Sequence, residues 1–192
     1  MKTFIMVAAV TLICFLGYER SSRAQTFDFG AQQLENKYND QLKLDNGDVI
    51  KNCSKRKDEI NCNFENTNFQ KSVQAFKQLN LANGRFELNE KLILSLSGQK
   101  VRTITLVGSR EDPMNLFHFV GQLGSLIIVL NPELTQDQVT SLLKDKLGIM
   151  RGYNDSTIGH PMVEITEKFA ATCNNQRSSV STKVGCVLEP RY

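Results

Sequence analysis

The run from Asp112 to Leu130 is the most apolar part of the mature chain, and it constrains the fold more than any other feature. Pro113 suits the first turn of a helix, where its missing N–H would have no partner, and Pro132 forces Asn131 out of helical geometry. The run is shorter than the roughly 20 apolar residues of a bilayer span, and polar side chains interrupt it. We therefore expect a core helix, and no transmembrane segment in the mature chain.

The polar side chains of this predicted helix share one narrow stripe, because they recur at intervals of three and four: Asn115, His118, Gln122 and Ser125. The rest of the helix is apolar, so we expect it to be covered nearly all round. Gly121 and Gly124, about one turn apart, predict close approach by another backbone. Asn115, His118 and Gln122 form a candidate functional stripe, with His118 as a general base or a ligand. The competing interpretation is a partly exposed, hydrogen-bonded histidine without a catalytic role.

The first 24 residues are predicted to be a signal peptide. Lys2 precedes an apolar run, and Ser22-Arg23-Ala24 supplies the small residues that a signal peptidase reads. One globular domain, residues 25–192, remains. It carries 20 basic against 19 acidic residues, a net charge of +1, so it lacks the basic footprint of a nucleic-acid-binding protein.

Export to the bacterial periplasm or to the extracellular medium is the predicted location. A eukaryotic extracellular protein is the alternative. Asn52-Cys53-Ser54 and Asn154-Asp155-Ser156 match the glycosylation acceptor pattern, which has meaning only in a eukaryotic secretory pathway.

Four of the five cysteines remain after Cys14 leaves with the signal peptide, and an even number in an exported protein predicts disulfides. Three pairings are open. We favour Cys53–Cys62 and Cys173–Cys186, because each pair brackets a short polar segment typical of a turn. A zinc site would need close Cys-x-x-Cys or histidine partners, which are lacking, so no metal is expected.

Apolar spacing predicts the remaining elements. Besides the central helix, helices are expected over residues 28–43, 69–81 and 135–148; for the end of segment 69–81, a strand that enters a hairpin turn at Asn83-Gly84 is the alternative. Strands are expected over residues 48–53, 59–65, 86–96, 101–107, 163–171 and 180–188. Because strands come as hairpins, the predicted fold is α+β, an antiparallel sheet of about six strands covered by three or four helices.

The register of one hairpin follows from its apolar pattern. A three-residue loop places Leu94 opposite Ile104 and Leu92 opposite Leu106, whereas a two-residue loop would oppose these leucines to threonines. We expect the three-residue loop. The central helix should then lie across the apolar face of this hairpin.

Catalytic and cofactor motifs are sparse. The chain has no Gly-x-Ser-x-Gly elbow, P-loop or dinucleotide fingerprint, so no cofactor is expected. His118 and His160 are the only histidines, and His160 is interpreted as a loop residue. The segment 45–48 is interpreted as a turn, because it lacks the spacing of a calcium loop. Four carboxylates in strands are expected on solvated faces, although their separation depends on the fold: Glu87, Glu90, Glu164 and Glu167.

These observations favour a binding or inhibitor-like module over an enzyme. Its partner would be another protein or an envelope component, contacted by loops 54–58, 98–100 and 151–159. One alternative is a small secreted hydrolase that uses His118. Another is a homo-oligomeric envelope structural protein that assembles through the apolar helix.

Overall fold

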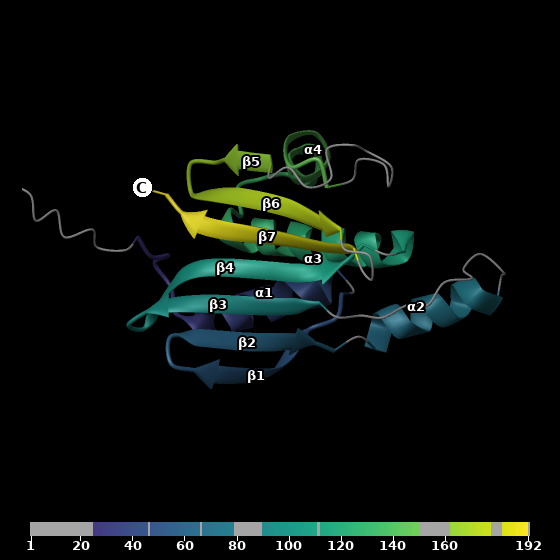
Figure 1. Ribbon diagram of the computed structural model, residues 1–192, viewed down its shortest axis with the longest axis horizontal. Helices are drawn as coiled ribbons and strands as arrows, with labels where there is room; N and C mark the ends of the chain where they lie inside the picture. Colours follow the sequence, from purple (N-terminus) through teal and green to yellow (C-terminus); the bar gives the residue numbers. More distant parts are fainter. Residues whose placement is uncertain are drawn as a thin grey trace, which may run out of the picture.

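The protein forms one antiparallel sheet of seven strands in the order β1-β2-β3-β4-β7-β6-β5, with helices packed on one side of it (Figure 1). The computed structural model describes residues 25–45, 47–65, 67–78, 90–110, 112–149, 162–177 and 182–191. The predicted α+β class is confirmed. The signal peptide, His160, Glu87 and loop 151–159 lie outside the described residues.

The strands are β1 (Ile50–Arg56), β2 (Glu59–Phe64), β3 (Lys91–Ser97), β4 (Lys100–Ser109), β5 (Met162–Ile165), β6 (Phe169–Arg177) and β7 (Thr182–Pro190). The helices are α1 (Ala31–Leu44), α2 (Thr67–Gln78), α3 (Pro113–Leu130) and α4 (Gln136–Ser141), and a π-helical turn (Leu142–Lys146) continues α4. All strand pairs are antiparallel. β7 lies between β4 and β6, so the last strand in the chain joins the two hairpin regions.

The seventh strand arises from a turn that the sequence pattern did not predict. The expected strand 163–171 is divided into β5 and β6, because Thr166 and Phe169 close a tight turn. The Thr166 side-chain oxygen accepts a hydrogen bond from the Phe169 N–H at 3.0 Å. Glu167 occupies a position that alternation would have buried, and in the turn it is exposed instead.

Helix α3 begins and ends where its flanking prolines predict. The Asp112 side chain accepts a hydrogen bond from the Met114 N–H at 2.8 Å and caps the helix, and Pro113 is its first residue. The helix packs against β4 and α1, on the same side of the sheet as α1 (Figure 1). Its length and composition would suit a membrane span, but half of it is buried inside the protein. That burial is typical of a core helix.

The β3–β4 register is the predicted one, although the loop is different. Leu94 pairs with Ile104 and Leu92 with Leu106. The loop is a two-residue turn at Gly98, whose φ of 65° is left-handed, and the register is restored by an irregularity between Thr103 and Val101. A bulge in the strand therefore supplies the extra residue that the prediction placed in the loop.

Both preferred disulfides are present, Cys53–Cys62 and Cys173–Cys186. Cys173 and Cys186 are directly paired on β6 and β7. The register of β1 and β2 shifts between Lys51 and Ser54, so Cys53 lies in a bulge that faces Cys62. Each disulfide therefore joins two neighbouring strands of the same hairpin.

The expected close approach at the two helix glycines is wrong. A Cβ at Gly121 would meet no atom within 4 Å, and one at Gly124 would meet side chains of the α4 region at ordinary contact distance. The tight approach is at Gly108 in β4, where a Cβ would lie 2.6 Å from Cδ2 of the Phe119 ring. Here β4 and α3 are in close contact.

Candidate functional site

The polar stripe of α3 points into the protein. Asn115, Gln122 and Ser125 are buried, and the His118 side chain is only 9% exposed. In contrast, Phe117 is 63% exposed, so the expectation that α3 is covered nearly all round is wrong on that side. Three of its side chains, His118, Gln122 and Ser125, have polar partners in or just after α1 and in the segments before β1 and β3.

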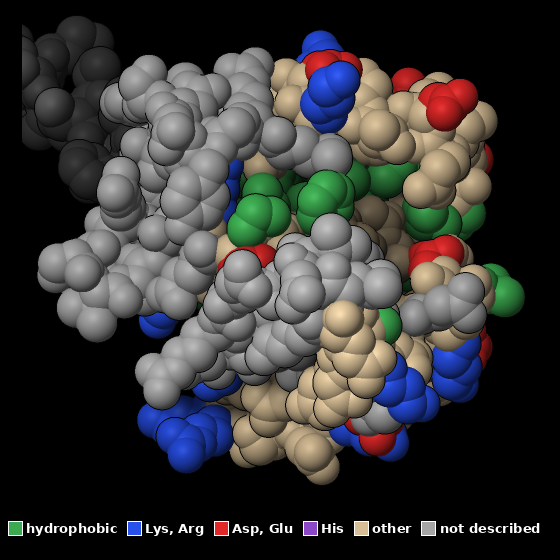
Figure 2. Space-filling view, turned by 90° about the vertical axis from the view of Figure 1, so that its right-hand side faces the viewer, with side chains coloured by type: hydrophobic (Ala, Val, Ile, Leu, Met, Phe, Trp, Pro, Cys, Tyr) green, Lys and Arg blue, Asp and Glu red, His purple; other side chains and the backbone are tan. Residues whose placement is uncertain are grey.

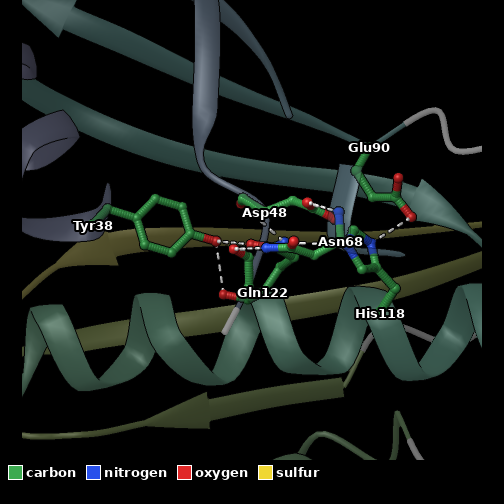
Figure 3. A network of polar contacts seen from close by, with 7 residues as sticks. Tyr38, Asp48, Asn68, Glu90, His118 and Gln122 are labelled. Carbon is green, nitrogen blue, oxygen red and sulfur yellow. Dashed lines mark hydrogen bonds and ion pairs between the residues drawn. The ribbon is translucent and has the colours of Figure 1, made fainter. Parts of the chain in front are cut away.

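His118 lies between two buried carboxylates (Figure 3). Its Nδ1 is 3.3 Å from Oε1 of Glu90, and its Nε2 is 3.4 Å from Oδ2 of Asp48. Glu90 immediately precedes β3 and Asp48 lies shortly before β1, so three separate elements meet here. We call Asp48, Glu90 and His118 the His118 cluster.

Further hydrogen bonds connect the His118 cluster to α1 and α2. Gln122 Nε2 donates to the backbone oxygen of Asp48 at 3.4 Å and lies 3.4 Å from His118 Nε2. The backbone N–H of Asn68, at the start of α2, donates to Asp48 Oδ1 at 2.7 Å. The cluster thus holds α2 and α3 to the beginnings of β1 and β3.

Tyr38 closes the network on the α1 side. Its hydroxyl donates to the backbone oxygen of Gln122 at 2.7 Å and approaches the side-chain oxygen of Gln122 at 3.3 Å (Figure 3). Burial, with the nearby charge of Asp45 as a smaller cause, raises the pKa of Tyr38 well above its usual value. Asp45 also accepts a hydrogen bond from the Ser125 hydroxyl at 2.5 Å.

This geometry gives His118 no ring nitrogen that is directed at a ligand. A general base must point one nitrogen at the substrate proton, but both nitrogens of His118 face protein carboxylates. Within the described part of the chain, no group of three His, Cys, Asp or Glu side chains is arranged to hold a metal. The arrangement is suited to holding these elements of the fold together.

Two of the three predicted contact loops, 54–58 and 98–100, meet at the end of the sheet that lies away from α2. The β1–β2 turn and the β3–β4 turn lie side by side in Figure 1, at the end away from α2. Behind them, between α1 and strands β1 to β3, is a cavity of about 360 Å³, which we call the turn-end cavity. Its lining residues are Ala31, Gln32, Glu35, Cys53, Lys55, Ile60, Cys62, Leu94, Leu96, Gly98 and Gln99.

Sequence reasoning missed the partners of His118. Glu90 was expected on a solvated face, and that expectation is wrong, because Glu90 is buried. The alternation of buried and exposed positions in the strand could have predicted this burial, because Glu90 lies two positions before the buried Leu92, on the apolar face of the strand. Asp48 stands in the same relation to the buried Ile50. Arg110, also buried, continues the inward alternation of β4 beyond Gly108.

Comparison with protein-family models, with curated proteins and with solved structures gave no match. Function must therefore be inferred from the two places where charged groups from several elements come together. The His118 cluster is closed and its groups face one another. The turn-end cavity is open, and three of its lining residues, Lys55, Gly98 and Gln99, belong to the loops that the sequence predicts as contact candidates.

Proposed function

We propose that the protein is an exported, disulfide-stapled binding module whose partner is another protein or an envelope component. The observation that carries this proposal is the position of His118, whose two ring nitrogens both face buried carboxylates. His118, the leading candidate for acid–base catalysis in the sequence, is therefore occupied by contacts within the protein. A hydrolase using His118 would need a different arrangement.

The scaffold also supports binding. Two disulfides fit an oxidising compartment outside the cytoplasm. Cys53–Cys62 fixes the β1–β2 hairpin, whose turn lies beside the β3–β4 turn. Loops held on a rigid sheet are the usual carriers of recognition, because little conformational entropy is lost when they bind.

The test is affinity capture with the mature protein, residues 25–192, from extracts of its own envelope or medium. We expect a stoichiometric partner that is lost with Lys57→Glu in the β1–β2 turn and retained with Lys144→Glu, an exposed lysine outside both turns. The hydrolase panel is run in parallel. Multiple-turnover hydrolysis that disappears in a folded His118→Gln variant, with no captured partner, would contradict the proposal.

Self-association is a second candidate, favoured by exposed apolar side chains. Phe117 on α3 is 63% exposed and Leu44 at the end of α1 is 77% exposed. Figure 2, viewed from the side on which α2 projects, shows hydrophobic side chains reaching the surface of this end. If the chain is a homo-oligomer, light scattering should give a multiple of the monomer mass, and Phe117→Ser should reduce it.

A further inference from the structure

We propose that the turn-end cavity binds a free α-amino acid with an apolar side chain. This inference goes beyond the proposed function, because it assigns a small ligand in addition to a macromolecular partner. Three features of the cavity support it: apolar lining residues, two opposite charges contributed by different elements, and a small volume.

The floor of the cavity is apolar. Ile60 of β2 and Leu94 and Leu96 of β3 line it, and Ile60 and Leu94 are directly paired across the two strands. The Cys53–Cys62 disulfide closes the β1 side and adds two further apolar sulfur atoms. An aliphatic or aromatic side chain can therefore be buried here against preformed surface.

The walls carry one cation and one anion. Lys55 comes from β1 and Glu35 from α1, and both line the cavity. Within the described residues neither forms an ion pair, with the other or with any third group. Four described surface lysines do form ion pairs, for example Lys51 with Glu65. A ligand with one carboxylate and one ammonium group would satisfy both charges.

Size and charge together exclude other classes of ligand. The cavity, about 360 Å³, is at the lower end of the roughly 300–1,000 Å³ of small-molecule sites, which suits one amino acid better than a long peptide or a nucleotide. A phosphate or a simple fatty acid would be attracted by Lys55 but repelled by Glu35. Amides of Gln32 and Gln99 on the rim can complete the hydrogen bonding of a zwitterion.

The test is calorimetric titration of the disulfide-intact mature protein with L-leucine and L-phenylalanine. We expect saturable binding of at least one of them. N-acetyl-leucine and leucinamide, which each lack one charge, should bind about 10-fold more weakly, as expected for loss of one charge-assisted hydrogen bond. Glycine, which lacks the apolar group, should show no binding.

Substitutions of residues that line the turn-end cavity test whether the amino acid binds there. Lys55→Gln and Glu35→Gln should each weaken leucine binding about 10-fold. Matched controls that do not line the cavity, Lys57→Gln and Asp40→Asn, should leave it unchanged. Leucinamide should bind Lys55→Gln as it binds the unmodified protein, because the group that Lys55 contacts is already missing. Ala31→Phe, which fills the cavity from the α1 wall, should abolish binding.

Two results would overturn the inference. One is no saturable binding of either amino acid up to about 10 mM by folded protein. The other is equal binding of leucine and its blocked derivatives, which would show that the charges on the walls are not used. Neither result affects the capture of a macromolecular partner, so the proposed function is tested independently of this inference.

Discussion

The His118 cluster and the turn-end cavity both bring acidic and basic groups together from separate elements, but with opposite outcomes. In the His118 cluster the charges face one another and are shielded from water. In the turn-end cavity Glu35 and Lys55 come from different elements, and neither forms an ion pair with another described residue. The difference indicates that a histidine flanked by carboxylates can serve the fold alone. Charged side chains that line a cavity and lack an ion-pair partner among the described residues are, in contrast, candidates for ligand recognition.

The largest expected effect is at the centre of the His118 cluster. Replacing His118 with Leu would remove the polar ring that contacts both buried carboxylates, Asp48 and Glu90, and would put an apolar side chain in its place. Removing one partner of a buried ion pair typically lowers the free energy of unfolding by about 3–5 kcal/mol, measurable by urea denaturation. Phe117→Ala, an exposed neighbour on the same helix, serves as the control and should have little effect.

Part of this stability should return when a carboxylate is also neutralised, as in His118→Leu with Glu90→Gln. If His118→Leu alone loses less than about 1 kcal/mol, the two carboxylates do not depend on His118, and the contrast with the cavity fails.

A smaller effect is expected at Gly108, which lies against both Phe119 and Glu90. A Cβ added there would be 2.6 Å from Phe119 Cδ2 and 3.3 Å from Glu90 Cγ. Since Phe119 is fully buried, the ring cannot move freely, and Gly108→Ala should cost about 1–3 kcal/mol by overpacking. Gly121→Ala is the matched control, because a Cβ there meets nothing within 4 Å. Equal melting temperatures for the two variants would contradict the close contact of β4 with α3.

Removing the Tyr38 hydroxyl should cost about 1–2 kcal/mol. Tyr38→Phe leaves two buried oxygens of Gln122 without that donor. Equilibrium denaturation measures the loss. An unchanged midpoint would mean that another group, or water, satisfies Gln122.

Tyr38 also gives the protein a specific response to alkaline pH. Its pKa is raised in the folded state, so above the ordinary tyrosine pKa of about 10 the unfolded chain loses this proton while the folded chain keeps it. Tyr38 therefore makes the free energy of unfolding fall as pH rises above about 10, and it has no effect on the pH dependence below that value. The extra alkaline loss should be absent in Tyr38→Phe.

The smallest effect on stability is expected at the turn-end cavity. Glu35→Gln and Lys55→Gln should each change the free energy of unfolding by less than about 0.5 kcal/mol, because neither side chain has an ion-pair partner among the described residues. Thermal melting measures this. A substantial destabilisation would show that these side chains support the fold, and the contrast between the two regions would disappear.

Local signals explain what the sequence could predict. Pro113 and Asn131 mark the ends of α3, and alternating leucines determine the β3–β4 register, because both depend on neighbours in the chain. The partners of His118 come from segments about 30 and 70 residues away, so their meeting depends on tertiary packing. The cavity is likewise formed by α1 and three strands. Alternation alone would still have placed Glu90 on the buried face, which is the part of the site that was predictable and was missed.

The position of β7 has a consequence for how the chain reaches its native state. The disulfides span only 9 and 13 residues, so each hairpin can be cross-linked early and locally. The pairing of β4 with β7 joins Ile104 to Leu188, and it is the only pairing that unites β1–β4 with β5–β7 within the described sheet. Closing so long a loop is slow compared with hairpin formation. Until it closes, both halves expose an unpaired inner edge, so the period of greatest risk for aggregation follows disulfide formation.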